Sequence, residues 1–280
     1  MTGFSDGEAS FSLRTTIDET RKIKVRVIPI FSIELHIRDI EVLNYILSYF
    51  KVGSVKPRLR GDRETAIYAV NSIKELTTVI IPHFKQYPLI TQKHADFILF
   101  ADAIELINSK HLTEQGILKI LSIKDSMGKG LSPDMKILYP NLVKLTRLVI
   151  DKQTIKSIWW LIGFVDAEGC FYIKVAKSKQ VSLSFSLSQH SRDTYLFTVI
   201  RDYINCGILE SVKTRNDIRL QVYSIKDLVE KIIPLFQDTL ITQKKEDFER
   251  FKEVSILMFK EHLLEQGLNK IILIKNKKFL

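Results

Sequence analysis

Alternation of apolar and polar residues is clearest in the stretch 181–188, which reads VSLSFSLS. A period of two predicts a strand with one face on a core and the other face exposed. Residues 23–32 show the same alternation less regularly. Helices are predicted at about 39–50 and 193–204, each followed by a glycine that serves as a stop signal, Gly53 and Gly207. Further strands are predicted at about 54–60 with 66–70, and 208–213 with 218–222.

The same pattern occurs twice along the chain. GFSDGEASF at 3–11 matches GFVDAEGCF at 163–171, and four later segments match in the same order, beginning at Phe31 and Phe185, Ser72 and Ser224, Leu89 and Leu240, and His111 and His262. The offsets are 160, 154, 152, 151 and 151 residues, and they shrink only in gaps that read as turns. Five ordered matches indicate two diverged copies of one unit in tandem.

Each copy reads as α-β-β-α-β-β-α-α, with one helix expected before Pro82 or Pro234 and longer helices after Thr91 or Thr242. We therefore predict an α+β fold of two pseudo-symmetric αββαββα repeats, each an antiparallel four-stranded sheet covered by helices. The predicted boundaries are 1–120 for the first repeat, 121–156 for a linker with four Gly or Pro residues, and 157–280 for the second repeat.

The charge balance points to a polyanionic partner. The 280 residues include 42 Lys and Arg against 32 Asp and Glu, a formal net charge of +10 and a pI of about 9.4. Basic residues near phosphates release condensed counterions, so nucleic acid is the first candidate and an anionic membrane surface the second. No stretch approaches the roughly 18 apolar residues of a membrane span, which argues against a membrane. The two cysteines and the scattered histidines show no zinc-ligand spacing.

Strand parity places a basic, hydrogen-bonding set of side chains on the exposed face of each sheet. An ordinary solvated strand face explains the Ser and Thr residues, but it explains the basic excess less well, since acidic residues are sparse there apart from Glu34 and Glu210. Such a face suits the DNA major groove, where Arg reads guanine and Gln reads adenine. Two such sheets side by side would form a long saddle. The predicted DNA-binding residues are Ser12, Arg14, Thr16, Lys22, Lys24, Arg26, Ser32, Lys56, Arg58, Arg60, Tyr172, Lys174, Ser182, Ser184, Ser186, Ser188, Arg219 and Gln221.

The paired motif carries the candidate chemistry. Gly3 with Gly7, and Gly163 with Ala167, leave one side of each short helix nearly bare, so two such helices could pack closely. That packing would bring their ends together, where Glu8 and Glu168 lie just before strands of the basic face. Adjacent carboxylates repel unless a proton or cation lies between them, and magnesium favours one or two carboxylates with waters and phosphate oxygens. The pair therefore implies metal-assisted phosphodiester hydrolysis. The alternative, a solvated helix-end glutamate, explains one copy better than two.

GFSDGEASF and GFVDAEGCF resemble the paired motif of the LAGLIDADG homing endonucleases, most closely the single-chain, fungal mitochondrial, intron-encoded type. The resemblance covers nearly the whole chain. It implies motif helices at the interface of the repeats and cutting of both DNA strands across the minor groove. It also implies magnesium or another divalent cation such as manganese, with calcium able to bind without supporting cleavage. The implied metal ligands are Glu8 and Glu168 with the backbone carbonyls of Gly7 and Ala167, and the implied groups around the metal waters are Gln189, Lys93 and Lys244.

Two departures from the family pattern stand out. Leu35 replaces the glutamine that matches Gln189, so the two sides of the site are unequal. Only Met1 and Thr2 precede Gly3, whereas Trp159-Trp-Leu-Ile precedes Gly163, so the first motif helix is expected to be truncated. Because the family uses one acid per motif, Asp6 and Asp166 are expected to be structural.

The resemblance implies a monomer with an internal pseudo-dimer that cuts double-stranded DNA at a long asymmetric target and so promotes intron mobility. It also implies a mitochondrial, organelle-encoded protein without a presequence. The main alternative is an intron-encoded maturase that binds intron RNA and assists group I splicing, but a maturase alone has no need of both carboxylates. A degenerate, inactive reading frame is the third interpretation, and the short first motif is its only support.

Overall fold

The computed structural model describes residues 1–20, 23–109, 113–128, 130–212, 215–260 and 265–276. The chain divides into two compact units, each of which contains one repeat. The N-terminal unit comprises Phe4–Asp151 with Thr2, and the C-terminal unit comprises Lys152–Leu280 with Met1 and Gly3. The unit boundary therefore follows Asp151, inside the span 121–156 that the sequence marks as non-repeating.

The N-terminal unit follows the predicted order of elements. Its elements are α1 (Thr2–Glu8), β1 (Ala9–Ile17), β2 (Val25–His36), the 3₁₀ turn η1 (Ile37–Asp39), α2 (Ile40–Phe50), β3 (Ser54–Arg60), β4 (Arg63–Val70), α3 (Ile73–Glu75), the π-helical turn η2 (Leu76–Ile80), α4 (Ile81–Gln86), α5 (Lys93–Asn108), α6 (Glu114–Ser126) and α7 (Pro133–Leu138).

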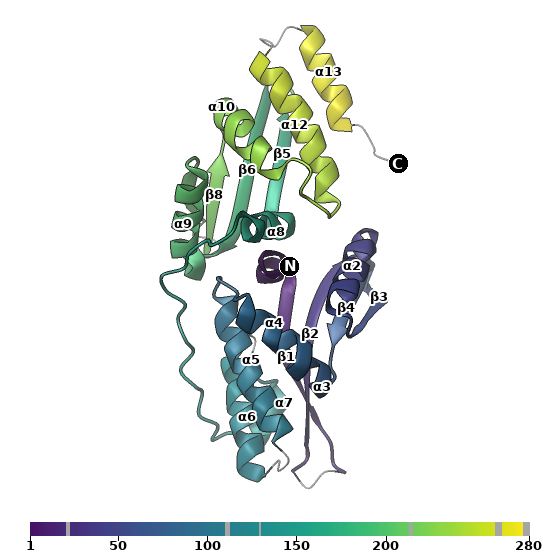
Figure 1. Ribbon diagram of the computed structural model, residues 1–280, viewed down its shortest axis with the longest axis vertical. Helices are drawn as coiled ribbons and strands as arrows, with labels where there is room; N and C mark the ends of the chain where they lie inside the picture. The colour runs from purple at the N-terminus through teal and green to yellow at the C-terminus, as the bar shows by residue number, and fades with distance from the viewer. Residues whose placement is uncertain (21–22, 110–112, 129, 213–214, 261–264, 277–280) are drawn as a thin grey trace. The chain divides into compact units, whose positions relative to one another are not determined.

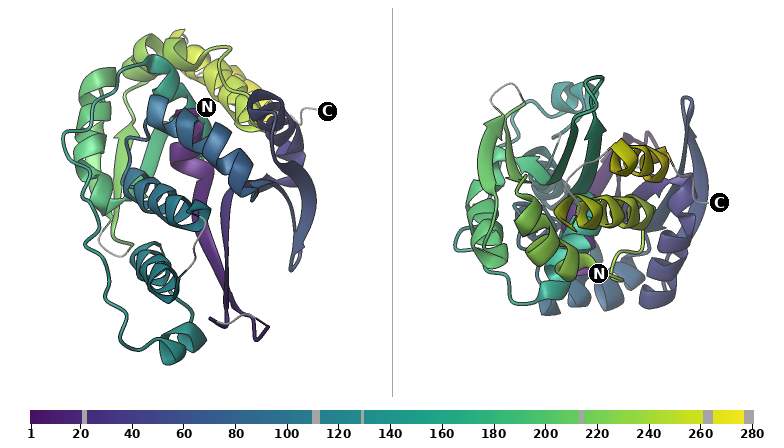
Figure 2. Two further views of the ribbon diagram at one scale, coloured as in Figure 1. Left: turned by 60° about the horizontal axis from the view of Figure 1, so that its bottom comes forward. Right: turned by 90° about the horizontal axis from the view of Figure 1, so that it is seen from above.

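The C-terminal unit repeats this order. Its elements are α8 (Ile158–Glu168), β5 (Gly169–Val175), β6 (Val181–His190), the 3₁₀ turn η3 (Ser191–Asp193), α9 (Thr194–Ile204), β7 (Ile208–Val212), β8 (Asp217–Val222), α10 (Ile225–Asp227), the π-helical turn η4 (Leu228–Ile232), α11 (Ile233–Phe236), α12 (Lys244–Lys260) and α13 (Glu265–Asn276). Within this unit α12 and α13 pack side by side (Figure 2).

Each unit contains one antiparallel four-stranded sheet. The strand orders are β1-β2-β4-β3 and β5-β6-β8-β7, with helices of the same unit packed on one face of each sheet (Figure 1). This confirms the predicted α+β class and its two αββαββα repeats. Among the described residues, no helix combines the length and the apolar character needed to cross a membrane.

The inward faces of the two sheets build matching aromatic cores. In the N-terminal unit the Phe11 ring lies 5.2 Å from Phe31 and 5.3 Å from Phe84, as centroid distances. In the C-terminal unit Phe171 lies 5.3 Å from Phe185 and 5.0 Å from Phe248. Aromatic rings at these separations add to the burial of apolar area that holds helices on a sheet. Because Phe11 and Phe171 lie three residues after the motif glutamates, this core fixes the strands that begin at the motif.

Two predicted stop signals act differently from the prediction. Helices α2 and α9 end at Lys51 and Asn205, which adopt the left-handed conformation with φ of 58° and 51°. Gly53 and Gly207 lie two residues further on, with φ of 84° and 90°, and an added Cβ would come within 2.6 Å of the Ala69 carbonyl oxygen or 2.8 Å of that of Gln221. These glycines therefore admit the next strand against the sheet instead of capping the helix.

The helix predicted to end before Pro82 continues past it. The wide turn η2 directs the amide of Ile81 to the carbonyl of Leu76, five residues back, and α4 then includes Pro82 and ends at Gln86. The C-terminal unit repeats this arrangement at Ile233 and Pro234. A proline lacks the N–H that a regular turn would require there, and the π-turn accommodates it near the start of the next helical segment.

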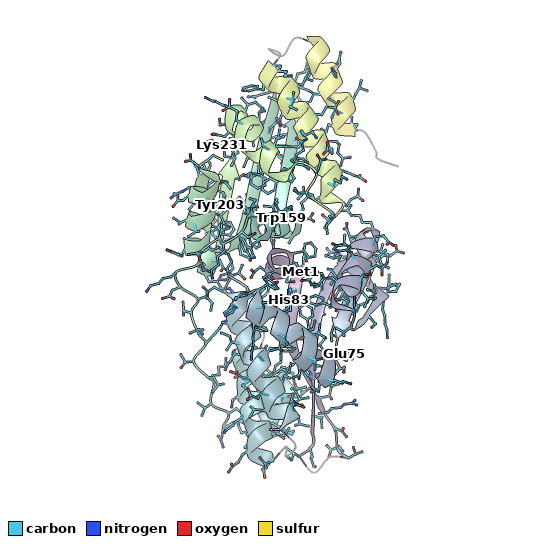
Figure 3. All side chains as sticks on the ribbon, in the orientation of Figure 1. Met1, Glu75, His83, Trp159, Tyr203 and Lys231 are labelled. Atoms are coloured by element: carbon cyan, nitrogen blue, oxygen red, sulfur yellow. The ribbon has the colours of Figure 1, made fainter. Side chains whose placement is uncertain are left out.

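A lysine joins η4 to the end of α9 in the C-terminal unit. Lys231 Nζ donates to the carbonyl oxygen of Asn205 at 2.7 Å and pairs with Asp227 at 2.7 Å. Figure 3 labels Lys231 and, on α9, Tyr203. A cation at a helix C-terminus satisfies a carbonyl that has no partner within the helix.

Part of the predicted linker belongs to the packed N-terminal unit. Helix α6 runs to Ser126, α7 lies within the span, and residues 139–157 contain neither helix nor strand. Gln92 exchanges two hydrogen bonds with the backbone of Ile150, of 2.7 and 3.1 Å, and Arg147 pairs with Asp96 at 2.9 Å. These contacts tie the extended segment to the start of α5.

Candidate functional site

Both motif glutamates end a helix and directly precede a strand. Glu8 is the last residue of α1 and Glu168 the last of α8, and β1 and β5 begin at the next residue. An added Cβ at Gly169 would lie 2.6 Å from the Val165 carbonyl oxygen, so this turn requires a glycine in the C-terminal unit. Helix α8 has 11 residues and α1 has seven, so the first motif helix is the shorter, as the sequence indicated.

Asp6 and Asp166 anchor the motif helices to the loops that precede α5 and α12. Asp6 is fully buried, and its carboxylate accepts from Ile90 N at 3.0 Å, Thr91 N at 3.2 Å and Thr91 Oγ1 at 2.6 Å. In the other unit Asp166 accepts from Ile241 N at 3.0 Å, Thr242 N at 3.3 Å and Thr242 Oγ1 at 2.6 Å. The hydrogen bonds give both aspartates the structural role expected of them.

Lys93 and Lys244 reach the last carbonyls of the motif helices. Lys93 Nζ donates to Gly7 O at 2.7 Å and Ser5 O at 3.1 Å. Lys244 Nζ donates to Ala167 O at 2.8 Å and Val165 O at 3.2 Å. An ammonium group at a helix C-terminus is favoured by the helix dipole. Each lysine therefore lies against the carbonyl that the resemblance names as a metal ligand, one residue before the motif glutamate.

Gln189 distinguishes the site residues of the C-terminal unit from those of the N-terminal unit. Its Nε2 donates to Glu168 Oε1 at 3.5 Å, and its Oε1 accepts from His190 N at 3.1 Å. Leu35 occupies the matching place in β2 and pairs with Ala66. Leucine has no polar side-chain group, so Leu35 cannot make the hydrogen bond to a glutamate that Gln189 makes in the C-terminal unit.

His94 follows Lys93 and lies close to this charged region. Burial lowers the pKa of the His94 imidazole, and the Asp6 carboxylate opposes that shift.

The donor set of each unit fits magnesium better than a metal that needs a dense cluster of ligands. Within the described residues, no group of three or more His, Cys, Asp and Glu side chains could hold a metal ion. Magnesium commonly keeps several waters and binds through one or two carboxylates plus substrate phosphates. One glutamate and one carbonyl oxygen per unit meet that need, because a carbonyl has a second lone pair beside the one directed at lysine.

The exposed face of the N-terminal sheet carries most of the predicted basic residues. The register puts Thr16 opposite Arg26 and Arg58 opposite Thr65, with Arg14, Arg26, Lys56, Arg58 and Arg60 exposed. Ser12 and Ser32 share the face and are half-buried. Lys24 precedes β2 instead of lying in it, and it pairs with Glu19 at 3.1 Å. Lys22 lies outside the described residues.

The exposed face of the C-terminal sheet is more polar than basic. The register pairs Tyr172 with Ser184, Lys174 with Ser182, Ser186 with Gln221 and Ser188 with Arg219. Tyr172 is 52% exposed, whereas Gln221 is 8% exposed and donates to Glu210 at 3.5 Å. Gln221 therefore offers little surface to a ligand, because its neighbours cover it.

Two histidines on these faces were missed by the sequence analysis. His36 pairs with Thr65 and His190 with Asp217, and in each the Nδ1 atom accepts from the amide two residues later at 3.2 Å. These two histidines occupy the same position in both repeats. Extending the alternation of the exposed face to the last residue of β2 and of β6 would have identified them.

Comparison with known protein families shows which family the chain belongs to. The LAGLIDADG endonuclease model matches residues 1–104 and again residues 161–255. The chain belongs to the LAGLIDADG endonuclease family. The two matches contain α1, the part of α8 from Leu161 onward with Glu168, both sheets and the lysines at the start of α5 and α12.

Relatives and solved structures of LAGLIDADG proteins extend the comparison. "Probable intron-encoded endonuclease 2" of Neurospora crassa is 35% identical over 99% of this chain and 64% of its own length. A second Neurospora relative, "Probable intron-encoded endonuclease 3", is 31% identical, and this chain spans 53% of its length. The structure titled "I-SmaMI bound to uncleaved DNA target in the presence of Calcium ions" superposes with a TM-score of 0.92 at 34% identity, covering 98% of this chain and 96% of that one.

Proposed function

We propose that this protein is a site-specific homing endonuclease that cuts both strands of double-stranded DNA at a long asymmetric target and thereby promotes intron mobility. The observation that supports this most directly is the repeated half-site. Each unit ends its motif helix in a glutamate, places a lysine on the preceding carbonyl, and continues into a sheet with a polar, partly basic exposed face. In each unit, the glutamate that ends the motif helix thus directly precedes the first strand of the sheet.

The relatives support nuclease over maturase. The two Neurospora proteins are named as endonucleases, and this chain retains a glutamate in both motifs. The structural relative I-SmaMI is described as bound to its DNA target. A maturase that only binds RNA has no chemical need of two carboxylates, so retention of Glu8 and Glu168 favours cleavage.

Glu8 with the Gly7 carbonyl, and Glu168 with the Ala167 carbonyl, would hold divalent metal, with magnesium or manganese as the productive ion and calcium as a non-productive one. The bound metal supplies Lewis acidity for the phosphate and a more acidic water as nucleophile. Hydrolysis breaks one P–O bond. The phosphorus gains the hydroxyl of the water, and the leaving oxygen gains the proton. Gln189 can orient a water near Glu168, since its amide already lies 3.5 Å from that carboxylate.

Lys93 and Lys244 hold the motif ends in place and supply positive charge. Each ammonium group fixes the last turn of its motif helix, and with it the direction of the following glutamate. The same charge would stabilise the additional negative charge that develops on a phosphate during hydrolysis. These two effects support a place for both lysines in the proposed site.

The exposed sheet faces would bind DNA, with the residues predicted from strand parity as the contacts, except Gln221, which its neighbours cover. We further propose that the protein acts as a monomer of two repeats and that it originates in mitochondria. The fungal intron-encoded relatives support that origin.

The direct test incubates the protein with duplex DNA that spans the uninterrupted insertion junction of the host gene, with magnesium and with EDTA. We expect double-strand cutting at one position with magnesium and none with EDTA. Cutting that persists in EDTA would refute the metal assignment. Splicing assistance to intron RNA by protein that cuts no DNA would instead support a maturase.

DNA binding can be separated from metal binding with one basic residue per sheet. Arg14→Ala and Lys174→Ala are each expected to weaken DNA binding by about tenfold and to reduce the salt dependence by about one counterion, because each removes one phosphate or base contact. Fluorescence anisotropy at several salt concentrations measures both quantities, and calorimetric titration with metal should be unchanged. Altered metal affinity with intact DNA binding would contradict the assignment of these strand faces.

A further inference from the structure

Glu34 is an acidic residue on the otherwise basic exposed face of the N-terminal sheet, and two arginines and a threonine contact it. It lies in β2, and its carboxylate is contacted by Arg58 Nη1 at 3.5 Å and Arg60 Nε at 3.3 Å, both from β3. Thr65 Oγ1 donates to Glu34 Oε1 at 3.0 Å. The Glu34 side chain is 22% exposed, while Arg58 and Arg60 are 46% and 60% exposed. One carboxylate therefore contacts the guanidinium groups of two arginines whose side chains remain accessible.

Stability alone does not account for this cluster. Exposed ion pairs contribute little net stability, because solvent screens the charges and two long side chains lose freedom. The lost freedom is useful when the arginines must read bases, since a planar guanidinium recognises guanine only in a fixed orientation. Without Glu34, each guanidinium could instead turn to the nearest phosphate, which carries no sequence information.

In the C-terminal unit, the residue that corresponds to Glu34 also contacts an arginine. The segment that begins at Phe31 matches the one that begins at Phe185, so Glu34 corresponds to Ser188. Ser188 Oγ accepts from Arg219 Nε at 3.0 Å, and the two residues are direct partners of β6 and β8. A carboxylate in one repeat and a hydroxyl in the other thus have the same kind of partner, although the arginines come from different strands.

We propose that Glu34 and Ser188 are positioning residues that orient the arginines of the two sheet faces and so set base preference separately in each half of the DNA target. This inference rests on the proposed function and refines it. Glu34 also keeps negative charge on the face, which penalises close approach of a wrongly placed phosphate. Specificity in the N-terminal half then depends on a residue that need not touch the DNA itself.

The test compares Glu34→Gln with Glu64→Gln. Glu64 lies in β4 of the same sheet, where it pairs with Leu59, on the opposite parity from Arg58 and Arg60. Both variants remove one negative charge from the same sheet, so the general electrostatic effect is matched. Binding is measured by anisotropy with calcium, on duplexes that carry each single base substitution of the cleaved target. Circular dichroism melts confirm that each variant folds.

We expect Glu34→Gln to lose about fivefold to tenfold in discrimination at a few adjacent base pairs of one half-site, and to bind random DNA at least as tightly as the wild type. Glu64→Gln should keep the wild-type profile. Ser188→Ala should lose discrimination only in the other half-site, and Ser188→Thr, which retains the hydroxyl, should restore it. Partial recovery in Glu34→Asp would point the same way.

Other outcomes distinguish failure of the positioning role from failure of the proposed nuclease function. A wild-type profile in Glu34→Gln, or an equal change in Glu64→Gln, overturns the positioning role while leaving the nuclease proposal intact. A uniform change at every base pair does so as well, because it reflects net charge only. If the wild-type protein shows no base preference in any duplex, the proposed function and this inference both fail.

Discussion

Replacing Glu168 by glutamine is expected to reduce magnesium-dependent double-strand cleavage by at least about a thousandfold, and Glu8→Gln should do the same. The amide keeps the size and most hydrogen bonds of the side chain but carries no charge for a divalent cation. Loss of metal-based stabilisation amounts to several kcal/mol, and each 1.4 kcal/mol is about a factor of ten in rate. Single-turnover cleavage of a supercoiled target plasmid measures the effect and also resolves nicking from double-strand cutting.

The control for this result is DNA binding in calcium, which should stay within about twofold of the wild type, because the sheet faces are unchanged. Glu64→Gln is the matched charge control, since Glu64 lies on the β3–β4 hairpin, away from the motif helix. If the double variant Glu8→Gln, Glu168→Gln still cuts with magnesium, the glutamates are not the metal ligands and the site assignment is wrong.

Asp166→Asn is expected to destabilise the protein by about 3 kcal/mol, and Asp6→Asn by a similar amount. Each carboxylate is almost fully buried and accepts three hydrogen bonds from the loop before α12 or α5. An asparagine turns one acceptor into a donor, so at least one buried N–H or O–H loses its partner. At roughly 2–4 °C per kcal/mol, the melting temperature should fall by about 10 °C.

Thermal unfolding followed by circular dichroism measures this loss, with Asp202→Asn as the control. Asp202 is 63% exposed and pairs with neighbouring Arg201, so its replacement should change the melting temperature by less than about 2 °C. An unchanged melting temperature in Asp166→Asn would show that these three hydrogen bonds contribute no net stability. Preserved stability together with lost cleavage would instead assign Asp166 to the chemistry.

Much of the fold could be predicted because local signals agreed with one another. The serine alternation in β6 is strict, and the repeat supplied each element a second time in a different sequence context. Helices α2 and α9 were placed within one residue at both ends, and β3 was placed at its observed bounds.

Errors arose where a residue's role depends on what lies across from it. Gly53 and Gly207 were interpreted as helix stops from their spacing, but the carbonyls of Ala69 and Gln221 on the neighbouring strand explain why glycine is required. Pro82 was interpreted as a boundary, since a regular helix lacks a place for it, yet the π-turn before it admits the ring. Gln221 was placed correctly on the exposed parity, but Glu210 and its other neighbours cover it.

The sequence by itself determined the repeat, the order of elements, the faces of the strands and the identity of the paired glutamates, because each of these depends on spacing and residue type along the chain. Tertiary structure decided which groups meet. Lys93 lies on the Gly7 carbonyl and Lys244 on that of Ala167 across 86 and 77 residues. Asp6 reaches Thr91, and Glu34 gathers two arginines from a strand that follows it by more than 20 residues. Such contacts depend on how strands and helices pack, which periodicity does not specify.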